Sequence, residues 1–210
     1  MNTFNYKTSS VNYKTSSLNY KTSSLTEFFA KVEIDNQADY SARLLALAGR
    51  FAASQTMLEF AAHLALRGAV KVLDGGNRFN AYTVARILRS LGAEDLMQSL
   101  ARIEVARAFT CYQMTAMLES TVSQKIPTLV IDLLDTFYDE SAALDERIRL
   151  AKRSAEHLQR LSRQAPVVVS LRPPPPSQSD PTGLQEIIQE AADRFYFQEM
   201  LPETPVLKLF

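Results

Sequence analysis

Residues 128–132 read TLVID, a short and unbroken apolar run that ends in a carboxylate. A strand that is buried on both faces has this pattern, whereas a strand with one solvated face alternates apolar and polar residues. Similar runs recur at residues 43–48 (RLLALA), 69–73 (AVKVL), 102–106 (RIEVA) and 166–171 (PVVVSL). Segments of helical periodicity separate these runs. The alternation predicts an α/β fold with a central, mostly parallel sheet that helices cover on both faces.

The segments between these strands predict the covering helices. Apolar residues recur at helical spacing over residues 54–67, and Asn80 is placed to cap a helix that runs to residue 91. Further helices and a last strand are expected at residues 94–100, 112–123, 141–163, 184–192 and, for the strand, 194–198. Together these elements predict one domain that spans residues 43–199.

Composition and charge limit the class of protein. The chain has 210 residues, of which 46% are hydrophobic, enough for one sizeable core. It contains no apolar run long enough to cross a membrane, and its N-terminus is polar, so we expect a cytoplasmic protein that does not enter a membrane. Lys and Arg number 23, as do Asp and Glu, so any binding of nucleic acid must be local.

The sequence offers few cysteine and histidine residues for disulfide bonds or metal sites. Cys111 is the single cysteine and there are two histidines, which excludes a disulfide framework and a zinc site of Cys/His spacing. A metal would have to be bound through carboxylates.

The two ends of the chain differ from the domain in composition. Residues 1–25 repeat the unit NYKTSS, whose apolar positions do not have coiled-coil spacing and whose polar residues bury little surface. We predict a disordered tail, with a phosphorylatable or adhesive tether as the alternative. Residues 26–42 form a linker or subunit-contact segment, and residues 200–210 a C-terminal extension.

The turn after the first strand bears a partial phosphate-loop motif. Residues 49–56 read GRFAASQT, which keeps Gly49 and Thr56 of the template G-x-x-x-x-G-K-[ST]. Ser54 stands at the second glycine and Gln55 at the lysine. A lysine places a positive charge on the phosphates, and glutamine offers only a dipole.

Three further segments extend the pattern: DGGNRF at residues 74–79, ARAF at residues 106–109, and the acid Asp132 after the fourth strand. With the phosphate loop, they resemble in order and spacing the ATPase core of the RecA/RadA recombinase family over residues 43–199. In this resemblance Asp74 and Phe79 match the acidic turn, and Asp132 matches the Walker B acid. It implies a three-layer RecA-like domain and a site for ATP, with magnesium on Thr56 and Asp132.

The departures from the family pattern fall on the residues that do chemistry. Gln55 replaces the phosphate lysine, and Gly76 stands where the family has the glutamate that activates water. Arg172 stands where the family has a glutamine that senses the terminal phosphate. The resemblance therefore implies a pseudo-ATPase with a vestigial nucleotide site, which consists of Gly49, Ser54, Gln55, Thr56 and Arg172.

The family's DNA-binding loops are poorly matched. The first would lie at residues 139–146, which include four acids, and the second at residues 172–181, where Arg172 is the one cation. Acids repel phosphate, so the sequence does not favour direct DNA binding by this route.

The resemblance implies that the protein acts by binding partner subunits and not by hydrolysing ATP. The leading hypothesis is a non-catalytic assembly partner or regulator in DNA recombination or repair, which binds RecA-like subunits (itself or a paralogue) through its sheet edges and flanking segments. Phe28 or Phe29 would take the place of the family's linker phenylalanine, although the usual Phe-x-x-Ala spacing is absent. The alternative for these segments is that they complete the core of their own domain.

Two other functions stay open. A residual ATP-binding enzyme or sensor would use Thr56, Asp132 and Arg172. A scaffold subunit of an unrelated RecA-like ring would need none of them.

Overall fold

The computed structural model describes residues 43–49, 52–139, 141–173 and 183–197. The repeat tail, the segment 26–42 with Phe28 and Phe29, and the extension 200–210 lie outside the described residues. The same holds for part of the phosphate loop, residues 50–51, and for most of the second DNA-loop segment, residues 174–182.

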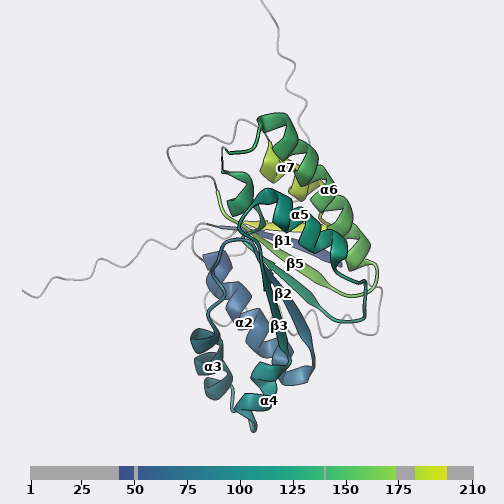
Figure 1. Cartoon of the computed structure of the whole chain (residues 1–210). Helices are drawn as coiled ribbons and strands as arrows, with labels where there is room; N and C mark the ends of the chain where they lie inside the picture. Colours follow the sequence, from purple (N-terminus) through teal and green to yellow (C-terminus); the bar gives the residue numbers. More distant parts are fainter. Residues whose placement is uncertain (1–42, 50–51, 140, 174–182, 198–210) are drawn as a thin grey trace, which may run out of the picture.

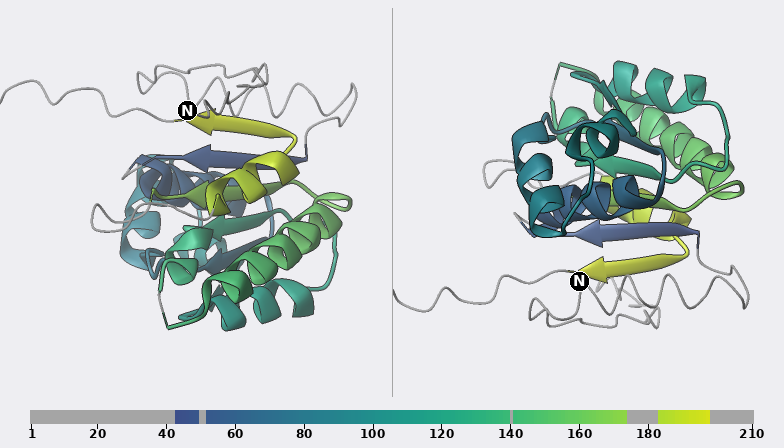
Figure 2. Two further views of the ribbon diagram at one scale, coloured as in Figure 1. Left: turned by 90° about the horizontal axis from the view of Figure 1, so that it is seen from above. Right: turned by 90° about the horizontal axis from the view of Figure 1, so that it is seen from below.

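One parallel sheet forms the middle of the domain. Its strands lie in the order β3-β2-β4-β5-β1-β6, and every pairing is parallel. The strands are β1 (Leu44–Ala48), β2 (Val70–Asp74), β3 (Ile103–Arg107), β4 (Thr128–Ile131), β5 (Val167–Leu171) and β6 (Arg194–Phe197). Figure 2 shows β1 and β6 side by side at one edge, with their arrows in the same direction. The expected α/β class is confirmed, and the sheet is parallel throughout.

Helices cover both faces of the sheet and complete three layers (Figure 1). The first face carries α2 (Ala52–Arg67), α3 (Ala81–Ser90) and α4 (Leu96–Ala101). The second carries α5 (Cys111–Ser120), α6 (Leu144–Ser162), α7 (Leu184–Ala191) and the 3₁₀ helix η1 (Leu133–Phe137). None of the helices in the described ranges has the length and apolar character that crossing a bilayer requires.

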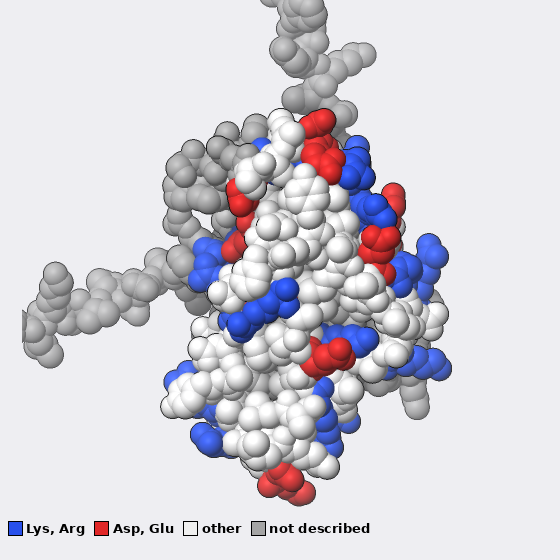
Figure 3. Space-filling model, in the orientation of Figure 1, with Lys and Arg blue, Asp and Glu red and all other residues white. Residues whose placement is uncertain are grey.

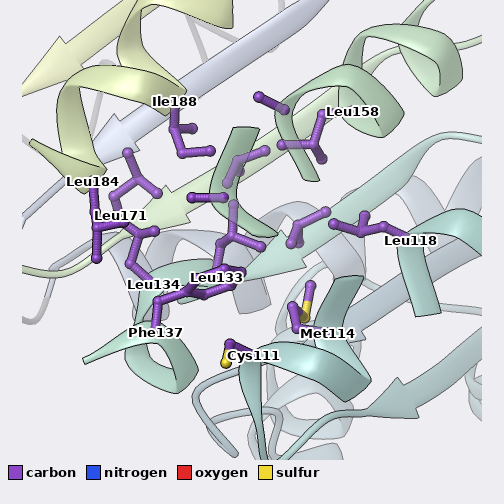
Figure 4. Close-up of a cluster of buried hydrophobic side chains, with 14 of the residues drawn as sticks. Cys111, Met114, Leu118, Leu133, Leu134, Phe137, Leu158, Leu171, Leu184 and Ile188 are labelled. Carbon is purple, nitrogen blue, oxygen red and sulfur yellow. The ribbon is translucent and has the colours of Figure 1, made fainter. Parts of the chain in front are cut away.

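The sheet separates two apolar clusters, because successive strand residues point to opposite faces. Leu129 and Ile131 of β4 face the α2 side, whereas Val130 faces the α5 side. Figure 4 shows the cluster on the second face, where side chains of η1, α5, α6, α7 and β5 converge. The labelled members are Cys111, Met114, Leu118, Leu133, Leu134, Phe137, Leu158, Leu171, Leu184 and Ile188. Burial on both faces explains the unbroken apolar runs in the central strands.

The starts of α3, α4 and α5 follow side-chain caps, whereas the segment after β4 differs from the expectation. Asn80 caps α3 as expected, because its side chain accepts a hydrogen bond from the Thr83 N–H at 3.0 Å. After β4, no helix was expected before residue 141. Asp132 there adopts a left-handed backbone with φ 48°, and η1 follows at once. Helix α6 starts at Leu144, three residues later than expected.

Candidate functional site

The predicted site residues lie close together at the carboxyl ends of neighbouring strands of the sheet. β2 ends at Asp74, β4 leads into Asp132, and β5 leads into Arg172. The Gly49 N–H donates to the Leu171 carbonyl at 3.1 Å, so the start of the phosphate loop lies beside the end of β5. Ligands of open parallel sheets bind beyond the carboxyl ends of the strands, which makes this end of the sheet the candidate site.

Asp132 is wholly buried at the centre of this end of the sheet. Its N–H donates to Ser170 Oγ at 2.8 Å, and the Ser170 hydroxyl donates back to Asp132 Oδ1 at 2.8 Å. The other oxygen, Oδ2, is buried and has no hydrogen-bond partner among the described residues. Burial raises the pKa of the Asp132 carboxyl to about 6, and the hydrogen bond from Ser170 opposes that rise. Asp135 raises this pKa further, whereas Arg172 and Arg78 lower it.

Gly76 packs directly against Asp132. The N–H groups of Gly75 and Gly76 both donate to the Ile131 carbonyl, at 2.8 and 3.3 Å, which holds the turn over the end of β4. A Cβ atom added at Gly76 would lie 2.6 Å from Asp132 Cβ and 3.2 Å from Asp132 Oδ2. Any side chain at this position therefore requires Asp132 to move. The resemblance aligns this position with the family's water-activating glutamate, and a side chain fits here only if Asp132 moves.

Asp74, which the resemblance aligns with the family's acidic turn, shapes the turn that contains Gly76. Its buried carboxylate accepts hydrogen bonds from the Arg78 N–H at 3.0 Å and the Phe79 N–H at 2.9 Å. Arg107 pairs with the same carboxylate at 3.3 Å and donates to the Phe79 carbonyl at 2.8 Å. These contacts hold the turn of residues 74–79 against the end of β3.

Arg172 is engaged by η1. Its guanidinium donates to Asp135 Oδ2 at 2.9 Å, and the Tyr138 hydroxyl donates to the Arg172 carbonyl at 3.1 Å. Burial raises the pKa of the Asp135 carboxyl, and the charge of Arg172 opposes that rise. A phosphate would have to compete with Asp135 for this arginine.

The rest of the partial phosphate-loop motif lies at the start of α2. The exposed Gln55 side chain donates a hydrogen bond to Glu59, one helical turn later. Thr56 is buried, and Ser54 belongs to the first turn of the helix. The described residues include no group of three or more His, Cys, Asp or Glu that could hold a metal ion. Magnesium on Thr56 and Asp132 stays a prediction.

Three residues at this end of the sheet were not singled out from the sequence: Ser170, Asp135 and Arg78. Ser170 had a usable signal, because it is the one polar residue in the buried run VVVSL. A polar group inside such a strand needs a partner, and that partner is Asp132. Asp135 and Arg78 look like ordinary surface charges in the sequence, and only the fold brings them to Asp132.

Comparison with protein-family models finds no match for this chain, and comparison with curated proteins finds no significant match either. The RecA resemblance stays a prediction that rests on motifs in their order along the chain.

Proposed function

We propose that the protein is a non-catalytic RecA-like subunit that serves as an assembly partner in DNA recombination or repair. Support comes from the parallel three-layer fold and from the placement of the motif residues at the ends of successive strands. The observation that carries the proposal is the contact between Gly76 and Asp132, because it removes the room that a catalytic base would need. The ion pair of Arg172 with Asp135 further reduces the capacity for phosphate.

Strand β3 offers an open edge for a partner. β3 pairs with β2 on one side only. The Arg102 carbonyl accepts from the Val70 N–H, and the Ala108 N–H donates to the Asp74 carbonyl, so even-numbered residues face β2. Backbone groups alternate in direction, and those of Ile103 and Val105 therefore point away from the sheet. An edge of this kind can accept an added strand.

The surface around this edge is apolar enough for a protein partner. Val105, Phe109 and Tyr112 are exposed, and the side chain of Phe109 is 66% accessible. In Figure 3 a mainly uncharged area covers the place where Figure 1 labels α5, and a few charged groups lie where it labels β2 and β3. Exposed apolar area of this sort commonly marks a protein interface.

The proposed occupant is the segment at residues 25–32 (LTEFFAKV) of a neighbouring subunit. Its aromatic and β-branched residues suit an added strand, and Phe28 or Phe29 would supply the anchoring ring. This subunit is a second copy of the chain or a RecA-like paralogue.

Light scattering at several protein concentrations tests the assembly. Val105→Pro removes the outward N–H and leaves the ladder to β2 intact, because Val105 does not bond β2. We expect this variant, and Phe28→Ala with Phe29→Ala, to weaken association by about thirtyfold, the effect of losing one anchor of about 2 kcal/mol. Val105→Thr keeps the N–H and should associate like wild type.

The melting temperature of each variant separates lost association from lost folding. A wild-type protein that stays monomeric and captures no RecA-like partner would refute the assembly proposal. A Val105→Pro variant that associates normally would exclude the β3 edge.

One observation favours a second function, residual nucleotide binding without hydrolysis. The unpartnered Oδ2 of Asp132 is a hard oxygen of the type that magnesium prefers. Calorimetric titration of ATP with magnesium tests it. Heat of binding that Asp132→Ala abolishes would support a sensor. The absence of heat would exclude this second function.

A further inference from the structure

The outer face of α3 carries arginine residues with a tyrosine among them. Tyr82, Arg86 and Arg89 are spaced by four and three residues, so they share one side of the helix. Arg78 lies in the turn just before the helix. All four residues are exposed, and the Tyr82 side chain is 73% accessible. The residues that α3 buries, Val84, Ala85 and Leu88, lie on another side.

This arginine stripe has no acidic neighbour in its stretch of chain. The sequence contains no Asp or Glu between Asp74 and Glu94, and Asp74 is buried and paired with Arg107. Within the described ranges, the guanidinium groups of Arg86 and Arg89 form neither hydrogen bonds nor ion pairs. In Figure 3, blue groups lie beside the position of α3, with no red group among them. The positive charges of Arg86 and Arg89 are therefore open to a ligand, whereas the charge of Arg78 also acts on Asp132 and Asp135.

We propose that the α3 stripe binds single-stranded nucleic acid, with Arg86 and Arg89 on phosphates and the Tyr82 ring stacked on a base. Positive side chains beside an exposed aromatic ring are the usual elements of such a surface. The exposed ring favours a single strand over a duplex, because the bases of a single strand are free to stack on it. A duplex would contact the arginines through its phosphates and offer no unpaired base to the ring.

This binding is local, which agrees with a net charge of zero for the whole chain. It also lies outside the two loops that the RecA resemblance would assign to DNA. It does not depend on the assembly proposal, since α3 covers one face of the sheet and the β3 backbone forms its edge.

Fluorescence anisotropy of a labelled oligo(dT) of about 20 nucleotides tests the stripe. We expect the logarithm of the wild-type affinity to fall linearly with the logarithm of the NaCl concentration, with a slope of about −0.7 per phosphate contact, over about 50 to 200 mM NaCl. Arg86→Gln with Arg89→Gln should lower affinity about tenfold and reduce the slope by about 1.4. Tyr82→Ala should lower affinity about fivefold or more, whereas Tyr82→Phe keeps the ring and the affinity.

A charge-matched control is available on the opposite face of the sheet. Lys152 and Arg163 are exposed at α6, so Lys152→Gln with Arg163→Gln removes the same charge away from the stripe. The control should bind like wild type. Thermal melts confirm that each variant folds.

Several results would overturn the proposal. These are wild-type protein that does not bind oligo(dT) at low salt, a control that loses as much affinity as the stripe variant, and a Tyr82→Ala variant that binds like wild type. Equal competition by polyglutamate would also reject it, in favour of an acidic protein partner.

Discussion

Gly76→Ala should lower the free energy of unfolding by about 2–3 kcal/mol, the cost of forcing extra volume into a packed site. The new Cβ atom would lie 2.6 Å from Asp132 Cβ, closer than carbon atoms can approach without a shift. Asp132 cannot move easily, because Ser170 holds both its N–H and its carboxylate. Urea unfolding of the purified variant measures the change.

Two companion variants identify the cause. Gly68→Ala at the end of α2 is the matched control, because a Cβ there meets nothing within 4 Å, and we expect a change within about 0.5 kcal/mol. In an Asp132→Gly background the clash is absent, so Gly76→Ala should cost much less than it does alone. If Gly76→Ala is as mild as Gly68→Ala, then a side chain fits at residue 76 and the steric argument fails.

Asp132→Asn should change the pH dependence of stability. The folded-state pKa of Asp132, about 6, lies above its ordinary value of 3.8, so the folded protein binds this proton more tightly than the unfolded chain does. The contribution of Asp132 therefore destabilises the fold as the pH rises from about 4 to about 6, by about 3 kcal/mol for a shift of about two units. Asparagine carries no such charge and also tolerates a left-handed backbone.

Unfolding free energies measured at a series of pH values give the comparison. The difference between Asp132→Asn and wild type should grow in favour of the variant from about pH 4 to about pH 6 and then stay constant. For Asp139→Asn we expect the opposite trend, a difference that grows in favour of wild type as the pH rises. The reason is that the hydrogen bond from the Ser141 N–H lowers the pKa of the Asp139 carboxyl. A difference curve for Asp132→Asn that is flat across this range would show that the buried carboxylate costs nothing.

The strands could be predicted from the sequence to within about one residue because burial on both faces leaves a continuous apolar run. TLVID and PVVVSL have no alternation that could be mistaken for another structure. The edge strand β3 was also found, although Glu104 and Val105 are exposed. The helices expected at residues 94–100 and 112–123 lie on either side of it in the sequence and limited its position.

The geometry around Asp132 could not be predicted in the same way. The sequence shows an acid after a strand, but the left-handed backbone and the bond to Ser170, 38 residues away, depend on the tertiary structure. η1 was missed because its five residues are too few for a periodic pattern, although Leu133, Leu134 and Phe137 have the spacing of one buried turn. The packing of Gly76 required coordinates for both partners.

Steady-state ATP turnover by the full chain with magnesium tests the central claim most directly. Gln55 places no cation on the phosphates and Gly76 has no room for a base, so we predict no phosphate release above buffer, for wild type and for Gln55→Lys alike. Phosphate release by wild type that disappears in Asp132→Ala would contradict the non-catalytic reading.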